Sequence, residues 1–486
     1  MRSLFKYCIV FTLILFGGCS KISEEDSIKF AISQNPQNLD PRYQSDAASE
    51  RVSNLLYSPF FFFDEQYHPK SNLVSWEKIS SLKYRFVIKN PLPIFHHGRV
   101  MNIDDIVGTL NELRGLETSH FHNELKNVSS ITKLSGQSFD IALITIDENF
   151  LSHLTFFVLP NDLLEKNHNF SENPIGSGSF MYLSNQPNLK IKRQNDGQTI
   201  ELIEIKDPTV RILKLIKNEV DLIQNDLSLE MIKLLEQKNN IQTLSGFGSN
   251  VSYIGFNFND PLLKEIKFRK ALSLAINRQA LIKYFLNDKT RIADQILPPE
   301  HWASVEMNSV DFNPSLARKL IEDMGIRTPI EIILKTSTDP FRVKIATLLQ
   351  NQLANVGVKL IIKSLDWGTY FRDIQAGRFQ LYGLTWVGIR NPEIYEKIFS
   401  SKLTPPLGLN RGGYTNIDMD VFLLEAKRTN VWKKVIEETY TSYGFIPLWF
   451  EGNVAAFNKN ISGYQISLDG SWDALNSIRK VNDDSH

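Results

Sequence analysis

His96 and His97 are the only two adjacent histidines in this chain of 486 residues. Imidazole is the commonest metal ligand in proteins, so the pair is a candidate metal site. Neighbouring side chains on an extended strand point to opposite faces, however, and such a pair cannot easily chelate one ion. We therefore expect neither a metal site nor another cofactor.

Motifs for catalysis are missing as well. The chain has no G-x-S-x-G elbow, no H-E-x-x-H and no G-x-x-x-x-G-K-[ST] loop. The glycines at 176/178 and 246/248 lack the third glycine of a dinucleotide fingerprint and are typical of turns. The acidic residues form no clear pair. We expect no catalytic residues and no enzyme, although an extracytoplasmic hydrolase assembled from distant residues stays an alternative.

Cys19 is a candidate for a covalent modification, a thioether bond to lipid. A basic start and an apolar run ending at Phe16 precede Gly17-Gly18-Cys19. This layout is typical of a secretory signal peptide, and it resembles the site at which bacterial lipoproteins are cut and acylated. We expect removal of residues 1–18, lipid on Cys19 and a polar tether over residues 19–27. An ordinary signal peptide and an uncleaved anchor are the alternatives.

Composition limits the remaining function classes. Cys8, the other cysteine, lies within the expected signal peptide, so the mature chain has no disulfide and no cysteine-ligated zinc or iron–sulfur site. Lys+Arg and Asp+Glu both number 54, and this zero net charge argues against a nucleic-acid partner. The length exceeds that of one ordinary domain, so we expect two or three.

Alternating strand and helix patterns must position any site. Hydrophobic periodicity predicts strands over 28–32, 84–89, 251–258, 358–362 and 379–386. It predicts helices over 103–113, 268–282, 341–356 and 366–377, with Asn102 as an N-cap and Gly357 as a helix stop. Strand–helix–strand alternation indicates α/β layers with partly parallel sheets.

Short motifs in one order run through the mature chain. The strongest lies between Tyr253 and Ile282 and contains R-K-A-L-S-x-A-I-x-R-x-x-L-I. Weaker ones lie at 38–41 (N-L-D-P), 76–98, 104–106, 173–180, 413–420 and 446–448. Together they resemble the extracellular solute-binding proteins of family 5, the oligopeptide-, dipeptide- and nickel-binding components of ABC importers.

The resemblance implies an α/β, two-lobed periplasmic-binding-protein fold (type II, cluster C) with an extra domain and hinge closure. The first lobe would be discontinuous, over 28–55, 160–255 and 446–486, with Pro447, Leu448 and Trp449 in its core. The extra domain would occupy 56–159 and the second lobe 256–445.

The resemblance also implies a function. The chain would be a monomeric, lipid-anchored receptor outside the cytoplasm, on the periplasmic face of a Gram-negative membrane or on a Gram-positive cell surface. It would capture a peptide or related small solute between its lobes and deliver it to the ABC permease subunits. A ligand-sensing or adaptor lipoprotein on the same fold is the alternative.

One segment departs from the family pattern. Peptide-binding members carry a W-x-x-D-x-x-D-P stretch whose Asp pairs with the peptide amino group. Here the segment Trp386 to Pro392 contains no carboxylate, and Arg390 has entered it. A guanidinium favours a carboxylate or phosphate, so the departure predicts an anionic group at this point.

The expected ligand contacts combine this segment with the family's site. We expect a flat aromatic face, anchors for an anionic group, amphipathic tyrosines and backbone near the N-L-D-P turn. These contacts are Trp386, Arg390, Arg411, Tyr414, Tyr43 and Asn38. Each has an alternative interpretation as core packing or ordinary surface.

Overall fold

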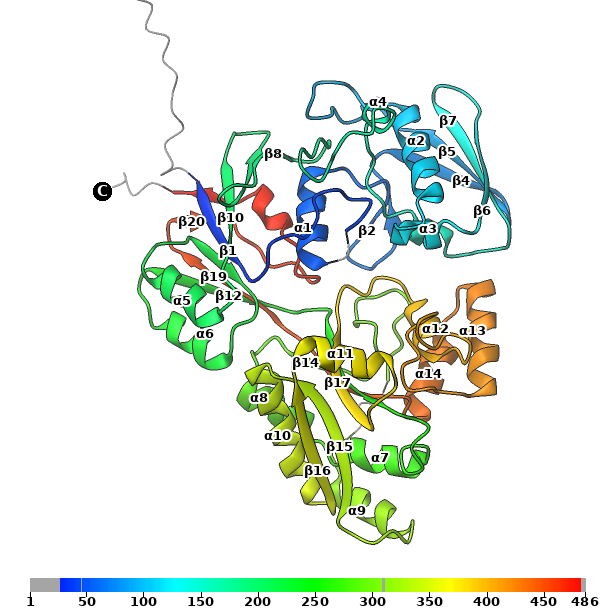
Figure 1. Cartoon of the computed structure of the whole chain (residues 1–486), viewed down its shortest axis with the longest axis vertical. Helices are drawn as coiled ribbons and strands as arrows, with labels where there is room; N and C mark the ends of the chain where they lie inside the picture. The colour runs from blue at the N-terminus through cyan, green and yellow to red at the C-terminus, as the bar shows by residue number, and fades with distance from the viewer. Residues whose placement is uncertain (1–26, 45, 308–310, 482–486) are drawn as a thin grey trace, which may run out of the picture.

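The computed structural model describes residues 27–44, 46–307 and 311–481, and Figure 1 shows them as two lobes with a further domain beside the first. The expected signal peptide, the lipidated cysteine and nearly all of the tether lie outside the described residues. Within the described part, every helix is too short or too polar to cross a bilayer.

The first lobe is built on a seven-stranded sheet of order β12-β19-β11-β1-β10-β9-β8. Its central strand β1 covers the residues expected and pairs in parallel with β10 and β11. The strands are β1 (Ile28–Ile32), β8 (Phe180–Ser184), β9 (Leu189–Arg193), β10 (Thr199–Glu204), β11 (Leu222–Gln224), β12 (Ile241–Gly246) and β19 (Asn453–Asn458). Its helices are α1 (Ala47–Leu56), α5 (Pro208–Ile216) and α6 (Leu229–Glu236), and β20 (Ile461–Ser462), η3 (Asp473–Asn476) and β21 (Arg479–Lys480) follow near the C terminus.

The extra domain holds a four-stranded antiparallel sheet of order β4-β5-β7-β6. Asn102 caps its main helix as expected, in a capping box with Asp105. The strands are β4 (Val74–Ser80), β5 (Lys83–Ile88), β6 (Val128–Lys133) and β7 (Ser138–Leu143), with the ribbon β2 (Phe62–Phe63) and β3 (Pro69–Lys70). The helices are α2 (Ile103–Gly115), α3 (His120–Glu124), η2 (Phe150–His153) and α4 (Asn161–Leu164).

The second lobe has a mixed six-stranded sheet of order β14-β18-β13-β17-β15-β16, in which β15 pairs in parallel with β16 and β17. This confirms the expectation of α/β layers with partly parallel strands. The strands are β13 (Val251–Phe256), β14 (Arg291–Ile292), β15 (Ile330–Ser337), β16 (Val358–Leu365), β17 (Leu381–Trp386) and β18 (Ile446–Phe450). The helices are α7 (Ile266–Leu274), α8 (Arg278–Phe285), α9 (Pro314–Glu322), α10 (Pro340–Ala354), α11 (Trp367–Gln375), α12 (Ile394–Phe399), α13 (Ile417–Thr429) and α14 (Lys433–Thr441).

The single helix expected over 268–282 is wrong, because this stretch forms two helices. Helix α7 ends at Leu274, and α8 begins after Asn277, whose side chain accepts a hydrogen bond from the Ala280 backbone N–H. An Asn at this position favours an N-cap over a helix interior. The apolar stripe runs on across the break because both helices pack into one core.

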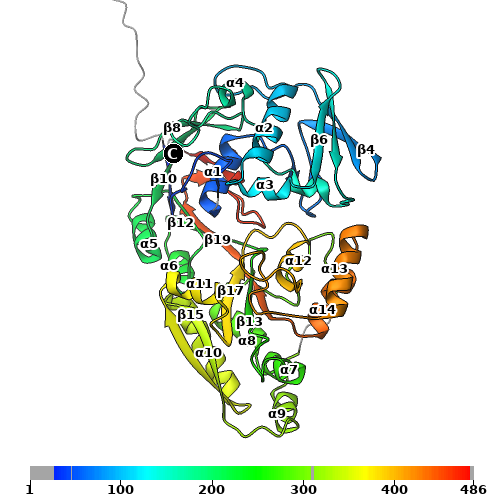
Figure 2. The ribbon, with the colours of Figure 1, turned by 45° about the vertical axis from the view of Figure 1, so that its right-hand side comes forward.

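Two short connections join the lobes. Residues 247–250 link β12 to β13, and residues 451–452 link β18 to β19; Figure 2 shows them crossing together. A Cβ on Gly248 would lie 1.9 Å from the Glu451 carbonyl oxygen, so glycine permits the close approach of the two connections. Relative motion of the lobes would be absorbed here.

This topology places β13 and β18 in the second-lobe sheet, whereas the boundaries expected at 256 and 446 assign both to the first lobe. Leu448 and Trp449 accordingly pack in the core of the second lobe. The sequence pattern indicates where each strand lies along the chain. It does not indicate whether the strand pairs in the sheet of the first lobe or of the second.

Candidate functional site

A cavity of about 1020 Å³ lies where the first lobe, the extra domain and the second lobe meet. Its volume suits a small-molecule or short-peptide ligand. The lining residues come from within the segments 46–54, 59–67, 120–124, 152–157, 387–397 and 467–473, together with Gln44. All three parts of the molecule therefore contribute to one site.

Carboxylates outnumber cations in the cavity wall. Eight carboxylate side chains line it, against Arg390, Lys397, His120 and His153 as the basic residues. The carboxylates are Asp46, Glu50, Asp64, Glu65, Glu124, Glu393, Asp469 and Asp473. An excess of one sign in a hollow with low-dielectric walls attracts the opposite charge. The cavity as a whole thus favours a ligand with a positive group.

Arg390 lies on the second-lobe side of this cavity and reaches the first lobe. Its Nη1 lies 2.8 Å from Glu50 Oε1, and its Nη2 lies 3.1 Å from Asp469 Oδ2. Burial lowers the pKa of Arg390, but the two carboxylates outweigh burial and leave the pKa above its ordinary value. The guanidinium is thus engaged by the protein's own carboxylates.

Trp386, Arg411 and Tyr414 lie together in the second-lobe interior. The Trp386 ring stacks on Tyr253 with centroids 5.3 Å apart, and the Arg411 guanidinium lies 5.0 Å from the Trp386 ring centre. The Tyr414 hydroxyl is 3.1 Å from Ser442 Oγ. Here these residues surround a void of about 20 Å³, room for about one water molecule, rather than the large cavity.

Asn38 and Tyr43 lie on the first lobe, near α1. Asn38 Oδ1 accepts hydrogen bonds from the Asp40 backbone N–H and from Ser171 Oγ, and the Arg42 guanidinium lies over the Tyr43 ring. Neither residue lines the large cavity in the described structure, although Gln44 does. Of the six expected contacts, the structure brings Arg390 to the cavity and places the other five elsewhere.

The His96-His97 pair serves two separate partners. His96 Nε2 lies 3.2 Å from the Gly178 carbonyl oxygen, and His97 Nε2 lies 3.8 Å from Asp162 Oδ2. Burial lowers the pKa of His96. The two rings therefore do not converge on one point, as expected for adjacent residues.

Asp473 is a cavity residue that no sequence motif indicates. It is exposed to the cavity, and its Oδ2 accepts a hydrogen bond of 2.9 Å from Ser471 Oγ. The protein around Asp473 partly desolvates its carboxyl and raises the pKa; the nearby Asp469 adds to the increase, while the Ser471 hydrogen bond and Arg390 oppose it. A cationic group of a ligand would offset both effects.

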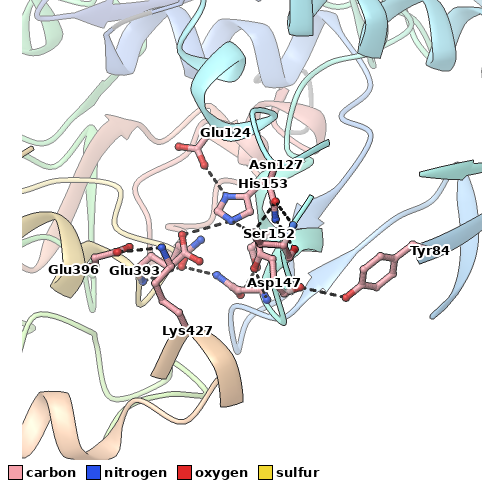
Figure 3. Close-up of polar contacts among 12 residues, drawn as sticks. Tyr84, Glu124, Asn127, Asp147, Ser152, His153, Glu393, Glu396 and Lys427 are labelled. Atoms are coloured by element: carbon pink, nitrogen blue, oxygen red, sulfur yellow. Dashed lines mark hydrogen bonds and ion pairs between the residues drawn. The ribbon is translucent and has the colours of Figure 1, made fainter. Parts of the chain in front are cut away.

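His153 is the second residue that sequence reasoning missed. In Figure 3 it lies among Glu124 and Asp147 of the extra domain and Glu393 of the second lobe. Burial lowers the pKa of His153, but the three carboxylates outweigh it and hold the pKa well above its ordinary value. Glu124, His153 and Glu393 of this cluster line the cavity.

Comparison with known proteins agrees with this architecture. The family model for bacterial extracellular solute-binding proteins, family 5 (middle region), matches residues 74–401. Di/tripeptide-binding protein 3 of Pseudomonas aeruginosa is 26% identical over 288 residues, and this match spans about half of each protein, 54%. Oligopeptide-binding protein AppA of Bacillus subtilis is 23% identical over 481 residues, covering 88% of this chain and 87% of that protein.

A solved structure shares the whole fold. The crystal structure of the ABC transporter substrate-binding protein CtaP from Listeria monocytogenes aligns with a TM-score of 0.84 at 20% identity. The alignment covers 94% of this chain and 99% of that one. The two-lobed architecture expected from the sequence is thereby confirmed.

Proposed function

Because this chain belongs to family 5 of the bacterial extracellular solute-binding proteins, we propose that it captures an amino-bearing solute, a short peptide in the first place, between its lobes. It then delivers the solute to the permease of an ABC importer. The protein binds and releases this solute without changing it. The relatives named for peptides support this choice of ligand class.

The acidic cavity is the observation that carries the proposal. A peptide amino group needs a carboxylate partner, and the segment from Trp386 to Pro392 offers none. Asp473 supplies one from the opposite lobe, where its side chain faces the cavity and accepts a hydrogen bond from Ser471 Oγ. Arg390, held between Glu50 and Asp469, stabilises the closed arrangement around the ligand instead of anchoring an anion.

The proposal includes attachment to a membrane through lipid on Cys19. The basic start, the apolar run and Gly17-Gly18-Cys19 support it. The protein would then work as a monomer outside the cytoplasm, on the periplasmic face or the cell surface. A lipid tether would keep it near its permease.

Peptide uptake in a strain that lacks the gene tests the function. Ala47 is exposed and lines the cavity, so Ala47→Trp should fill part of the ligand space. Ala376 is also exposed but lies outside the cavity, which makes Ala376→Trp a matched control. We expect the wild-type and Ala376→Trp genes to restore uptake of labelled di- and tripeptides and Ala47→Trp to fail. Equal uptake with and without the gene would contradict an import role and favour a sensor.

A further inference from the structure

His153 carries an unusual set of neighbours at the contact between the extra domain and the second lobe. Its Nδ1 lies 2.6 Å from Glu124 Oε2. Its Nε2 lies 3.4 Å from Asp147 Oδ2 and 3.4 Å from Glu393 Oε2. The residue is only 9% exposed, and Figure 3 shows the carboxylates converging on its ring.

Glu124 fixes the orientation of this ring. The Glu124 carboxylate accepts a hydrogen bond from Nδ1–H, which keeps the proton on Nδ1 and turns Nε2 toward the other two carboxylates. Carboxylate–histidine pairs orient metal ligands in this way. Two carboxylate oxygens facing Nε2 need a positive charge between them. A proton can supply it, and so can a metal ion.

The separations suit an ion. Metal–ligand bonds of about 2.1 Å in a tetrahedral site place neighbouring ligand atoms about 3.4 Å apart. The distances from His153 Nε2 to Asp147 Oδ2 and to Glu393 Oε2 are both 3.4 Å, and the ligand atoms of the three residues all lie within 4.8 Å of one another. An imidazole with two carboxylates suits zinc, nickel or cobalt better than calcium or magnesium.

The formal charges around the ring also favour a divalent cation. Lys397 Nζ lies 3.4 Å from Glu124 Oε1, and Lys427 Nζ lies 3.0 Å from Glu396 Oε1. With Asp147 and Glu393, four carboxylates thus face two lysines around a histidine. One divalent cation would balance this group with the imidazole neutral.

We propose that Asp147, His153 and Glu393 bind one divalent transition-metal ion, with Glu124 as the residue that orients the imidazole. The ion takes the place of the proton on Nε2. Because Glu393 belongs to the second lobe and the other ligands to the extra domain, the ion ties the two together and favours the closed form. Three protein ligands leave a coordination position for water or for a group of the bound solute.

The residues of this site form no motif in the sequence. Asp147 and His153 lie in an irregular segment before and within η2, and Glu393 comes 240 residues after His153. The hydrogen bond of 2.7 Å from Asn149 Nδ2 to Asn391 Oδ1 holds the two segments side by side.

Zinc binding to the full chain, purified in detergent and stripped with EDTA, tests the proposal without any solute. Equilibrium dialysis against Zn²⁺ and elemental analysis should find one ion per wild-type chain. Asp147→Asn and Glu393→Gln should each weaken binding at least about tenfold. Glu425→Gln, which changes an exposed carboxylate of the second lobe paired with Lys434, should bind as the wild type does.

A second readout separates this site from adventitious zinc. Co²⁺ at a site with a histidine ligand gives visible absorption, which should appear in the wild type and in Glu425→Gln and be lost in Asp147→Asn. Wild-type protein that binds no ion would show that a proton alone occupies the cluster, and binding unchanged in both ligand variants would place the ion elsewhere. Either result overturns the site and leaves solute capture untouched.

Discussion

Arg390 of the second lobe lies 2.8 Å from Glu50 of α1 in the first lobe, Nη1 to Oε1, at the wall of the cavity. Asp469, also from the first lobe, holds the other side of the same guanidinium. The contact exists only when the lobes are together. It therefore contributes free energy to closure, and through closure to retention of the ligand.

Removal of this contact should loosen the closed form. We expect Arg390→Gln to weaken solute binding by about three- to thirtyfold, which corresponds to a coupling of about 0.5–2 kcal/mol. Glu50→Gln should have a similar but smaller effect, since Asp469 remains. In a double-mutant cycle measured by titration calorimetry, the two effects should be less than additive. Arg378→Gln removes an exposed ion pair within the second lobe and should change nothing, whereas full additivity in the cycle would contradict the role given to Arg390.

Asp473 should give solute binding a dependence on pH. Its pKa is raised, so acidification protonates this carboxyl earlier than an ordinary one and removes its attraction for an amino group. We expect affinity to fall as the pH drops through a value above 3.8 and the Asp473→Asn variant to bind weakly, with a flatter pH profile. Glu331→Gln, on the far edge of the second lobe, is the control. An unchanged profile in Asp473→Asn would exclude Asp473 as the amino-group partner.

His301 should make the fold sensitive to mild acid. Burial lowers its pKa to about 4, while its Nε2 lies 3.3 Å from the Arg390 carbonyl oxygen. Its folded pKa lies below the unfolded one, so between about pH 6.5 and 4 the unfolded state binds more protons. Stability therefore decreases as the pH falls through this window, by up to about 3 kcal/mol from this residue.

Urea unfolding at several pH values measures this contribution. His301→Gln should lower stability at neutral pH but show a shallower loss between pH 6.5 and 4 than the wild type. His68→Gln, which changes an exposed histidine, should keep the wild-type slope. The same slope in all three proteins would show that His301 does not titrate in this range.

Cys19→Ser tests the lipid anchor. Without the thiol no lipid can be attached, so the variant should move from the membrane fraction to the soluble fraction after cell lysis. Alkaline carbonate extraction with immunoblotting measures the distribution. A variant that resists extraction would show that the N-terminal apolar segment is an uncleaved anchor.

Helices and strands could be predicted from the sequence where apolar periodicity and helix-capping residues determine them. The apolar pattern predicts the strand 28–32, and capping chemistry predicts Asn102 and Gly357 as helix boundaries. The apolar pattern does not show the break at Asn277, because the apolar stripe continues across it. An N-cap residue inside a periodic stripe is a signal that could have found it.

The site could be predicted only in part. The departure from the family pattern drew attention to Arg390, but its partner Glu50 lies 340 residues away in the sequence and carries no motif. Trp386 has a side chain suited to stacking on a ligand, but it lies in the core. Its stacking on Tyr253 depends on the tertiary structure and cannot be read from the sequence. The acidic excess likewise arises from three parts of the fold that meet only in space.

Native mass spectrometry of the full chain, purified without denaturation, tests solute capture most directly. We expect a wild-type mass that exceeds the polypeptide and its lipid by one short peptide or another amino-bearing solute, released when the protein is unfolded. The Ala47→Trp variant should lack this extra mass, and Ala376→Trp should retain it. A wild-type protein without extra mass, which also acquires none when mixed with di- and tripeptides, would contradict capture of such a solute between the lobes.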